Sequence, residues 1–531
     1  MFDLIIENGQ VVDGTGAPIF RADVGIAAGK VAALGNLSHA GAARRIDAAG
    51  LVVAPGFIDM HNHSDTALLA NPLAESYSRQ GCTTLVIGHC GHTTAPISPD
   101  KRTRLQETLA VIDFVDEWKW PTFGAYLDSL AERRTAVNVV PLVGHCAIRA
   151  EVVGFDNRPA TEDELRRMRQ LIAQSMDEGA WGFSVGLMYP PSLYARTDEL
   201  VELCRTVAER DGLFAMHMRS YSSTVVESVA EACEIARISG VRTQIAHLGA
   251  AGRPNWGKIA HCLELIDDAN RTAQIRADKY PYTAVCANLN QRLPGWTHAG
   301  GADAMLARLA DPAARARIRA EMDNPPPEWT DHIPVDPDCI VIALVASERN
   351  KWVMGKSIAE VAAQRGCDPT DAILDLILEE RNRVTMIAHA QLEEETSAVI
   401  AHRYGMVASD GWAVAPYGPL GTGKPHPRCY GTFPRVLSRY VREQGMIPLE
   451  EAVHKMTGAP AAMLKLEDRG TLAVGKAADI CIFDPGTVRD RADYADPHQY
   501  PDGIPYVIVN GSVEIENGKH NGTLKGVVLR G

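Results

Sequence analysis

Two histidines separated by one residue, His61 and His63, follow the first strongly apolar stretch of the chain, residues 51–59. Side chains two positions apart on a β-strand point to the same side, so both imidazoles would face one site. Neutral histidine is a good ligand for zinc. The spacing therefore favours a metal position at this strand end, while a solvent-exposed histidine pair remains the alternative for so short a motif.

A cysteine between glycines follows the next apolar run, residues 84–87. Cys90 stands in the sequence Gly88-His89-Cys90-Gly91. Thiolate is a zinc ligand, and the flanking glycines allow the backbone to bend so that the thiol turns inward. A buried, inert thiol is the alternative. His89 and His92 are competing ligands, and we rank both lower because each lies off the expected strand-end register.

Two further histidines each close an apolar run. His217 follows residues 213–216, and His247 follows residues 243–246. One such histidine is more often a core residue than a ligand. Two of them on consecutive strands, with a helical segment between, favour a pair of metal ligands.

A carboxylate completes the series. Asp410 follows the run 406–408 and precedes Gly411. Beside a metal, a carboxylate can orient a water molecule and accept its proton, whereas the alternative is an ordinary turn aspartate before glycine. The order of two histidines, cysteine, histidine, histidine and aspartate along successive strand ends predicts one metal-dependent hydrolytic site.

The elements that must position these residues alternate between short apolar runs and amphipathic segments. The expected strands are residues 84–87, 137–143, 182–185, 213–216, 243–246, 276–277, 384–387 and 406–408. The clearest expected helices are residues 162–178, 197–210, 225–239 and 258–270. This alternation predicts an α/β fold, a (β/α)₈ TIM-like barrel whose site lies at the C-terminal strand ends, with a doubly wound open sheet as the alternative.

The two chain ends have a different pattern, with short strands separated by glycine-bearing turns. We expect residues 1–55 and 466–531 to form one small β-sandwich domain beside a barrel of residues 56–465. Residues 295–335 are rich in proline, glycine and tryptophan and interrupt the alternation. They indicate an insertion on the barrel and a candidate lid.

The composition limits the class of protein. The chain has 531 residues, more than one hydrophobic core usually serves, with 46% hydrophobic and 22% charged residues. Its net charge of −13 argues against nucleic-acid and anionic-membrane partners. The N-terminal residues lack the pattern of a secretory signal, and eleven scattered cysteines are typical of reduced thiols. We expect a cytoplasmic protein; its oligomeric state does not follow from the sequence.

Longer stretches resemble the N-acyl-D-amino-acid deacylase (D-aminoacylase) family of the amidohydrolase superfamily. The resemblance covers essentially the whole chain. It is carried by residues 53–63 (VAPGFIDMHNH), 182–191 (GFSVGLMYPP), 217–219 (HMR), 278–282 (DKYPY), 409–411 (SDG), 426–433 (HPRCYGTF) and 475–479 (GKAAD).

This resemblance implies a metal site and a reaction. Its implied ligands are Cys90, His217 and His247 for a tightly bound zinc ion, and His61, His63 and Asp410 for a second, weaker position. Asp410 would be the catalytic base and then the acid. Arg428 would hold the substrate α-carboxylate, and Tyr189, Tyr194 and Arg219 would be further substrate contacts. The implied activity is zinc-dependent hydrolysis of the amide bond of N-acyl-D-amino acids.

Two departures from the family pattern concern specificity and the metal. The family often has lysine two residues after the last histidine ligand, where this chain has Gly249, which favours a neutral or hydrophobic substrate side chain over an acidic one. His89 stands where asparagine is more usual. Residues 182–186 hold no lysine that could bridge two metals, which argues against a cyclic-amide hydrolase. That activity, a dipeptidase acting on C-terminal D-residues, and a non-catalytic metal-binding scaffold remain the alternatives.

Overall fold

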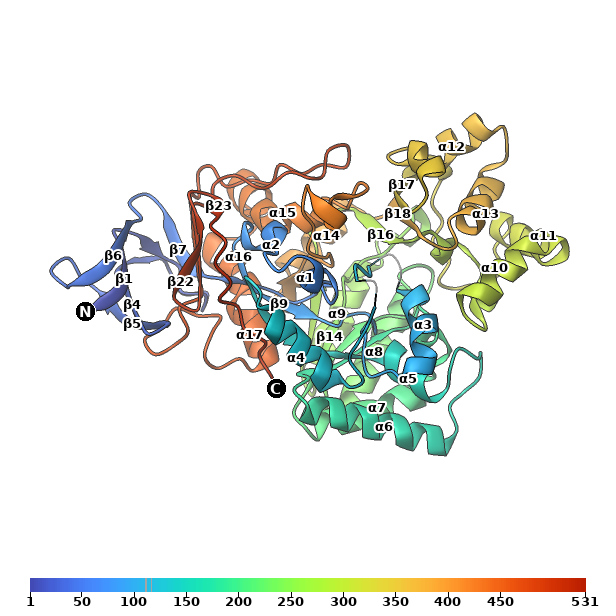
Figure 1. Cartoon of the computed structure of the whole chain (residues 1–531), viewed down its shortest axis with the longest axis horizontal. Coiled ribbons are helices and arrows are strands. Elements are labelled where there is room, and N and C mark those ends of the chain that lie inside the picture. The colour runs from blue at the N-terminus through green and yellow to red at the C-terminus, as the bar shows by residue number, and fades with distance from the viewer. Residues whose placement is uncertain (110–111, 116) are drawn as a thin grey trace.

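A β-rich part and a helical part lie at opposite ends of the molecule, with a barrel between them (Figure 1). The computed structural model describes residues 1–109, 112–115 and 117–531. Both predicted features of the fold class, a parallel barrel and a sandwich-like β-part, are present. Among the described residues, no helix is both long enough and apolar enough to cross a membrane.

Parallel strands form the barrel. In chain order they are β8 (Phe57–Asp59), β9 (Cys82–Ile87), β10 (Asn138–Pro141) with β11 (Val143–Gly144), β12 (Gly182–Gly186), β13 (Leu213–His217), β14 (Arg242–Ile245), β15 (Ile275–Lys279) and β19 (Gly405–Val407). Their order in two sheets is β10-β9-β8 and β11-β12-β13-β14-β15-β19. Only Leu142 separates β10 from β11, so together they are one of eight barrel strands. The predicted (β/α)₈ barrel is confirmed.

The barrel closes where β19 meets β8, at the strand ends that carry the predicted site. A parallel bridge pairs Asn62 with Gly411. The amide of Asp410 donates to the carbonyl of His61, and the amide of His63 donates to the carbonyl of Gly411. The first and last barrel strands therefore bring His61, His63 and Asp410 side by side.

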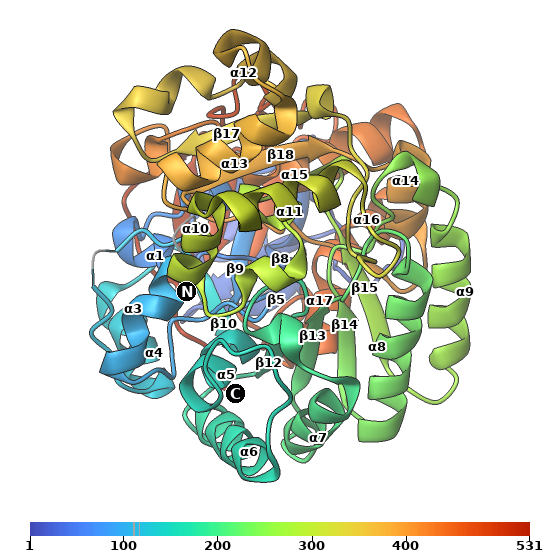
Figure 2. The ribbon, with the colours of Figure 1, turned by 90° about the vertical axis from the view of Figure 1, so that its right-hand side faces the viewer.

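Helices cover the outside of the barrel (Figure 2). They include α4 (Phe123–Arg133), α5 (His145–Val152), α6 (Glu162–Asp177), α7 (Thr197–Ala208), α8 (Val225–Ser239), α9 (Ile259–Ala269), α14 (Glu393–Ala401) and α16 (Leu449–Met456). Local sequence explains where several of them begin and end. Thr161 and Glu164 form a capping box at the start of α6, and Gly240 ends α8 in the left-handed conformation.

The lower end of the barrel is filled with apolar side chains. Ile58, Val86 and Ala215 of the strands pack with Ala461 and Leu464 of α17 (Gly458–Leu464). Because this end is packed solid, the chemistry-bearing residues have open space only at the other end, as is general for such barrels.

The remaining helices border the upper barrel or extend from it. They are α1 (Ala67–Ala70), α2 (Glu75–Ser78), α3 (Pro99–Thr108), η1 (Ser192–Tyr194), η2 (Arg253–Asn255), η7 (Gly418–Gly421), α15 (Arg428–Arg435) and the π-helix η8 (Val436–Glu443). Among them, α15 begins at Arg428, which places that guanidinium near the upper barrel end.

Two sheets built from both ends of the chain share one hydrophobic core. One has the order β5-β4-β1-β6, and the other has the order β23-β22-β21-β20-β7-β2-β3. The strands are β1 (Phe2–Glu7), β2 (Gln10–Val11), β3 (Phe20–Arg21), β4 (Asp23–Ala27), β5 (Lys30–Gly35), β6 (Ala42–Asp47), β7 (Val52–Pro55), β20 (Ile480–Phe483), β21 (Tyr506–Val509), β22 (Ser512–Glu516) and β23 (Lys519–His520). Ile6 and Ile26 of the first sheet pack with Val53 and Ile482 of the second.

The apolar stretch 51–59, expected as a single strand, is divided. Strand β7 ends at Pro55 in the sheet with the C-terminal strands, and β8 starts the barrel at Phe57. Gly56 lies between them against Thr83, whose side chain a Cβ at position 56 would approach within 2.2 Å. Close packing at this glycine therefore lets one run of residues serve two sheets.

One expected barrel strand is wrong. Residues 384–387 belong to β18 (Val384–His389), which pairs antiparallel with β16 (Ala284–Asn288) and β17 (Ile340–Val345) in a separate sheet. A short apolar run fits a buried strand of either sheet type, so the pattern could not distinguish them. The eighth barrel strand is β8 (Phe57–Asp59), which takes the place of 384–387 in the expected set.

This separate sheet and its helices form an insert with its own hydrophobic core, between β15 and α14. Leu309, Ile318, Ile342, Val361 and Leu374 belong to that core. Its helices are η3 (Leu289–Arg292), η4 (Gly295–His298), α10 (Ala302–Ala310), α11 (Pro312–Asp323), η5 (Pro337–Cys339), η6 (Glu348–Val353), α12 (Ile358–Arg365) and α13 (Pro369–Glu379). The insert, residues 284–389, extends beyond the expected 295–335.

Candidate metal centre and active site

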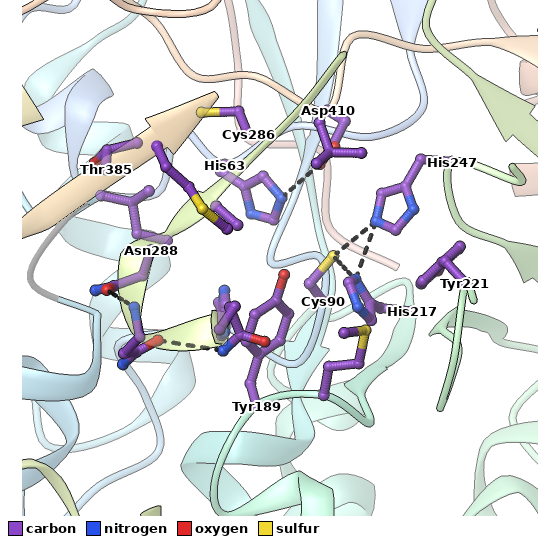
Figure 3. Close-up of a pocket in the computed structure, with 18 of the residues that line it drawn as sticks. His63, Cys90, Tyr189, His217, Tyr221, His247, Cys286, Asn288, Thr385 and Asp410 are labelled. Atoms are coloured by element: carbon purple, nitrogen blue, oxygen red, sulfur yellow. Dashed lines mark hydrogen bonds and ion pairs between the residues drawn. The ribbon is translucent and has the colours of Figure 1, made fainter. Parts of the chain in front are cut away.

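The six predicted metal-site residues converge at the upper end of the barrel. They come from the ends of β8, β9, β13, β14 and β19, as the strand-end spacing predicted. Figure 3 shows His63, Cys90, His217, His247 and Asp410 around one pocket. All six residues are at most 7% exposed. The sequence pattern therefore located a real cluster.

Three of these side chains form a compact triangle. The Cys90 Sγ atom lies 3.5 Å from Nδ1 of His217 and 3.8 Å from Nε2 of His247, and the two ring nitrogens are 3.0 Å apart. Tetrahedral zinc, with Zn–S near 2.3 Å and Zn–N near 2.0–2.1 Å, places neighbouring ligand atoms about 3.3–3.6 Å apart. The residues present therefore fit a zinc ion in both donor type and spacing.

A second set of donors adjoins the triangle through Asp410. Its Oδ1 atom is 3.2 Å from Nε2 of His61 and 3.1 Å from Nε2 of His63. His61 Nε2 is also 3.3 Å from Cys90 Sγ. One ligand atom each from His61, Cys90, His247 and Asp410 lies within 4.8 Å of the others. This arrangement could hold a second cation next to the first.

The backbone is unusual at three of the clustered residues. Cys90, His247 and Asp410 have φ angles of 53°, 33° and 51°, in the left-handed region that residues with a Cβ seldom adopt. Such conformations cost free energy and persist where the surrounding structure imposes them, most often at functional sites. Here they turn side chains from separate strand ends toward a common centre.

Asp278 holds two of the histidines in place, one through its ring and one through its backbone amide. Its Oδ2 atom is 3.2 Å from Nδ1 of His61 and accepts a hydrogen bond from Nε2 of Gln244 at 2.6 Å. Its Oδ1 atom accepts from the backbone amide of His247 at 2.8 Å. A carboxylate on the far ring nitrogen orients a ligating imidazole and raises its basicity.

The electrostatics of the pocket suit a cation. Burial alone would raise the pKa of the Cys90 thiol, but the facing His61 and His217 outweigh it and hold that pKa well below its usual range. Burial likewise opposes ionisation of Asp410, yet Arg428, His247 and His61 keep the pKa of its carboxyl well below the ordinary value. Burial would lower the pKa of His63, but Asp410 and Cys90 raise it to about 9. The pocket therefore favours a thiolate and a carboxylate within a few ångströms of each other.

A cavity of about 150 Å³ opens onto the cluster. His63, Cys90, His217, His247 and Asp410 line its floor. Its walls are largely apolar and include Leu109, Ile112, Met188, Val285, Ala287, Ile333, Met386 and Trp412. Several of these come from β16 and β18, so the insert supplies one wall, while Ile333 comes from the expected insertion 295–335.

Two of the four predicted substrate contacts lie on this cavity. The Tyr189 ring centroid is 4.7 Å from that of His217. Arg428 is 2% exposed, its Nη1 atom lies 2.7 Å from Oδ2 of Asp410, and its guanidinium carbon is 4.8 Å from the Tyr280 ring centroid. Both side chains face the metal-ligand cluster.

The structure places the other two predicted contacts elsewhere. Arg219 forms an ion pair with Glu231 of α8 at 2.9 Å and borders a shallow surface pocket near Thr197. Tyr194 is not among the residues lining the main cavity, and its hydroxyl has no hydrogen-bond partner in the described part of the chain. We assign no substrate contact to either residue.

Sequence reasoning missed Tyr221 at the site, and it ranked His89 and His92 below Cys90 as ligands. Tyr221 packs against His217 and His247, with ring centroids 4.9 Å from each, and its hydroxyl donates to the carbonyl of Ala246. His92 lines the cavity beside Tyr189, at 4.6 Å between ring centroids. His89 stacks on His61 at 4.2 Å instead of facing the cavity. His89 and His92 could be named from the sequence because both stand in the Cys90 loop, whereas Tyr221 carried no such signal.

Comparison with known proteins gives matches over most of the chain. Residues 44–251 and 355–514 match the model of a family described as the amidohydrolase family. The chain is 35% identical over 531 residues to a D-aminoacylase of Alcaligenes xylosoxydans xylosoxydans, covering 99% of this chain and 97% of that protein.

Solved structures agree with the sequence match. The N-acyl-D-glutamate deacylase of Bordetella bronchiseptica, complexed with zinc and a phosphonate mimic of the tetrahedral intermediate, superposes with a TM-score of 0.85 at 32% identity. A D-aminoacylase studied for the role of its binuclear metal centre, with one-metal activation and second-metal attenuation, superposes with a TM-score of 0.83 at 33% identity. Each match covers 100% of both chains.

Proposed function

The chain belongs to the amidohydrolase family, within its group of D-aminoacylases and N-acyl-D-amino-acid deacylases, and on this premise we propose that it hydrolyses the amide bond of N-acyl-D-amino acids in a zinc-dependent reaction. The products would be a carboxylate and a free D-amino acid. The observation that carries the proposal is the triangle of Cys90, His217 and His247 with Asp410 beside it.

We assign the tight zinc position to that triangle. The second, weaker position would use His61, His63 and Asp410. Zinc bound at the first position would polarise the amide carbonyl and acidify a water molecule. Asp410 would be both a ligand of the second position and the proton carrier. A cation in that position would therefore compete with proton transfer.

Asp410 is the proposed proton carrier. An Oδ atom of Asp410 would accept the proton of the attacking water and then deliver it to the nitrogen of the departing amine, so the carboxylate is regenerated. Its depressed pKa keeps it ionised and ready to accept. Arg428, which pairs with Asp410 in this structure, would turn to the substrate α-carboxylate, whose two oxygens match its fork of donors.

The cavity supports a preference for neutral or hydrophobic substrate side chains. Met188, Val285 and Met386 present apolar surface to it. An acidic side chain placed against these three residues would lose its hydration without gaining a partner from them. The relatives that act on acidic substrates show that the family accepts both kinds, so this preference is particular to the walls of this cavity.

A substrate screen tests the proposal. Purified protein would be incubated with N-acetyl-D-leucine, N-acetyl-D-methionine and N-acetyl-D-glutamate and with their L-enantiomers, with and without a chelator. We expect chelator-sensitive release of the neutral D-amino acids. Zinc binding without turnover on a broad amide panel would support a metal-binding scaffold. Faster release from dipeptides with a C-terminal D-residue would support a dipeptidase.

The remaining expectations concern setting and assembly. All eleven cysteines are free thiols, which supports the proposal of a cytoplasmic protein. The proposed substrates are small molecules.

A further inference from the structure

A lysine is buried beside the proposed active site without a counter-ion. Lys279, at the end of β15, is 1% exposed. Its Nζ atom donates to Oε1 of Gln391 at 2.6 Å and lies 4.7 Å from the Tyr280 ring centroid. No carboxylate of the described residues lies within 4 Å of it. Burying an ammonium group with one neutral partner is costly, and this burial lowers the pKa of Lys279 to about 7.

This lysine determines how the neighbouring amide is oriented. Nζ of Lys279 donates to the carbonyl oxygen of Gln391, a bond that the amine can make charged or neutral, although burial lowers the pKa of Lys279 to about 7. The Nε2 hydrogens of Gln391 therefore point to the other side of the amide plane. No described residue accepts a hydrogen bond from them. Gln391 lines the cavity that holds Cys90 and Asp410, whereas Lys279 does not.

Gly249 leaves the space that this pair occupies. A Cβ at position 249 would lie 2.6 Å from Nε2 of Gln391 and 2.9 Å from Nζ of Lys279. The backbone of Gly249 is not in the left-handed region, so the need for glycine here is one of space. Three separate segments of the chain thus form one arrangement. Gln391 lines the cavity, Lys279 holds its amide oxygen from outside the cavity lining, and Gly249 leaves space for both side chains.

The arrangement shares a tyrosine ring and a cavity with Arg428. The ring of Tyr280 has the Arg428 guanidinium carbon 4.8 Å and the Lys279 ammonium 4.7 Å from its centroid. Arg428 and Gln391 both line the same cavity. A ligand carboxylate in this cavity has lone pairs enough to accept from Arg428 and from the Nε2 hydrogens of Gln391 together.

We infer that Gln391 is a second hydrogen-bond donor to the substrate carboxylate, beside Arg428, and that Lys279 is a positioning residue that fixes the Gln391 amide in its donating orientation. Gly249 is the residue that leaves room for both. This inference rests on the proposed function and deepens it. It also means that this side of the cavity offers an anion a hydrogen-bond donor even though residue 249 is glycine and not lysine.

Four variants test the inference with N-acetyl-D-leucine as substrate and D-leucine as a binding probe. Gln391→Glu keeps the length of the side chain and an oxygen for Lys279 but removes the Nε2 donor. Gln391→Met removes both polar atoms. Lys279→Met removes the group that orients the amide. Gly249→Ala removes no polar group but displaces the amide. Zinc content and thermal unfolding would be measured for each.

We expect KM for N-acetyl-D-leucine and Kd for D-leucine to rise about tenfold or more in Gln391→Met, as for loss of a hydrogen bond to a charged group, with kcat and zinc content changed much less. Gln391→Glu should raise both at least as much, although its ion pair with Lys279 preserves stability. Lys279→Met and Gly249→Ala should each raise KM by a smaller factor.

The double variant Lys279→Met/Gln391→Met gives the sharpest outcome. If Lys279 acts only through Gln391, the double variant binds no more weakly than Gln391→Met alone. If the double variant weakened binding by the product of the two single-variant factors, the positioning role of Lys279 would be overturned. Unchanged binding in both Gln391 variants would overturn the whole inference. Because binding of D-leucine is measured apart from turnover, a protein that bound D-leucine but hydrolysed no N-acyl-D-amino acid would refute the proposed function and still decide this inference.

Discussion

The guanidinium of Arg428 contacts Asp410 with 2.7 Å between Nη1 and Oδ2, and both side chains are almost completely buried. In this arrangement the proposed substrate anchor lies against the proposed proton carrier. A substrate carboxylate that drew Arg428 away would leave Asp410 with a weaker cationic neighbour and a greater affinity for a proton. Substrate binding and proton transfer are therefore coupled through one ion pair.

Replacing Arg428 with methionine should change both the affinity and the pH profile. Loss of the cation removes a group that lowers the pKa of Asp410, so that pKa rises. The basic form of Asp410 is then lost at a higher pH, and the acid limb of the kcat/KM profile should move to higher pH by about one unit or more, with a raised KM. Arg428→Lys should keep the acid limb near its original position while still raising KM. If the acid limb of the kcat/KM profile did not move in Arg428→Met, Arg428 would not control the pKa of Asp410.

Asp410→Asn should remove proton transfer while leaving the triangle of Cys90, His217 and His247 intact. We expect kcat to fall by about 10²–10⁴-fold, the range for general acid–base catalysis. Zinc at the first position should remain, which metal analysis of the dialysed variant would check. Near-normal turnover with zinc still bound would exclude Asp410 as the proton carrier.

Metal content should distinguish the two proposed positions. Cys90→Ala should abolish tight zinc binding, because it removes the thiolate that His217 and His247 share. His63→Ala should retain about one zinc per chain after dialysis and lose only the weaker position. Elemental analysis of the two purified variants makes the comparison. The opposite pattern would reverse the assignment of the positions.

Asp278→Asn should weaken metal binding without removing a ligand. The carboxylate holds the His61 ring and the His247 backbone amide, so its neutral isostere would leave the ligands less well oriented. Loss of such outer contacts typically lowers metal affinity about 10–100-fold. Competition with a chromophoric chelator would measure the change. Thermal unfolding of the zinc-free protein would report separately any loss of fold stability.

A buried carboxyl far from the metal site should control how stability depends on pH. Burial raises the pKa of Glu514 from 4.5 to about 9, and its Oε2 atom has no hydrogen-bond partner among the described residues. Because the folded pKa is the higher one, the stabilising contribution is fully present below pH 4.5 and is lost as pH rises toward 9.

Glu514→Gln should therefore flatten this dependence. It keeps an acceptor for the Lys525 amide, which donates to Oε1 in the native protein. We expect the variant to be more stable than the native protein by about 1–3 kcal/mol at pH 8 and little changed at pH 4. Thermal unfolding across that pH range provides the measurement. A parallel pH dependence in the two proteins would contradict the assignment.

The sequence could predict the metal-site cluster because each of its members stands at the end of a strand. His217 and His247 close neighbouring apolar runs, and parallel strands bring such ends together whatever the intervening helices contain. The same logic could not find Gln391. It lies 112 residues from Lys279 along the chain, with the insert between them. The two side chains meet only because the chain comes back to the barrel after the insert.

Other expectations depended on information that a linear pattern lacks. Residues 384–387 have the apolar character of a barrel strand, but their partners are antiparallel strands of the insert. Arg219 follows His217 by two positions, yet β13 ends at His217, so strand alternation no longer directs the Arg219 side chain. Glu231 of α8 then pairs with it. In both cases the structure depends on tertiary partners, which leave no periodic pattern in the local sequence.

The insert packs around a core of its own while contributing Val285 and Met386 to the cavity. Reactive groups on the barrel and the surface that selects among substrates thus belong to separately packed pieces of one chain. Mutations in the insert can accumulate, and change which amides are accepted, with little risk to metal binding. Exchange of residues 284–389 between relatives is accordingly a modular route to new substrate ranges, and laboratory evolution of this enzyme should begin there.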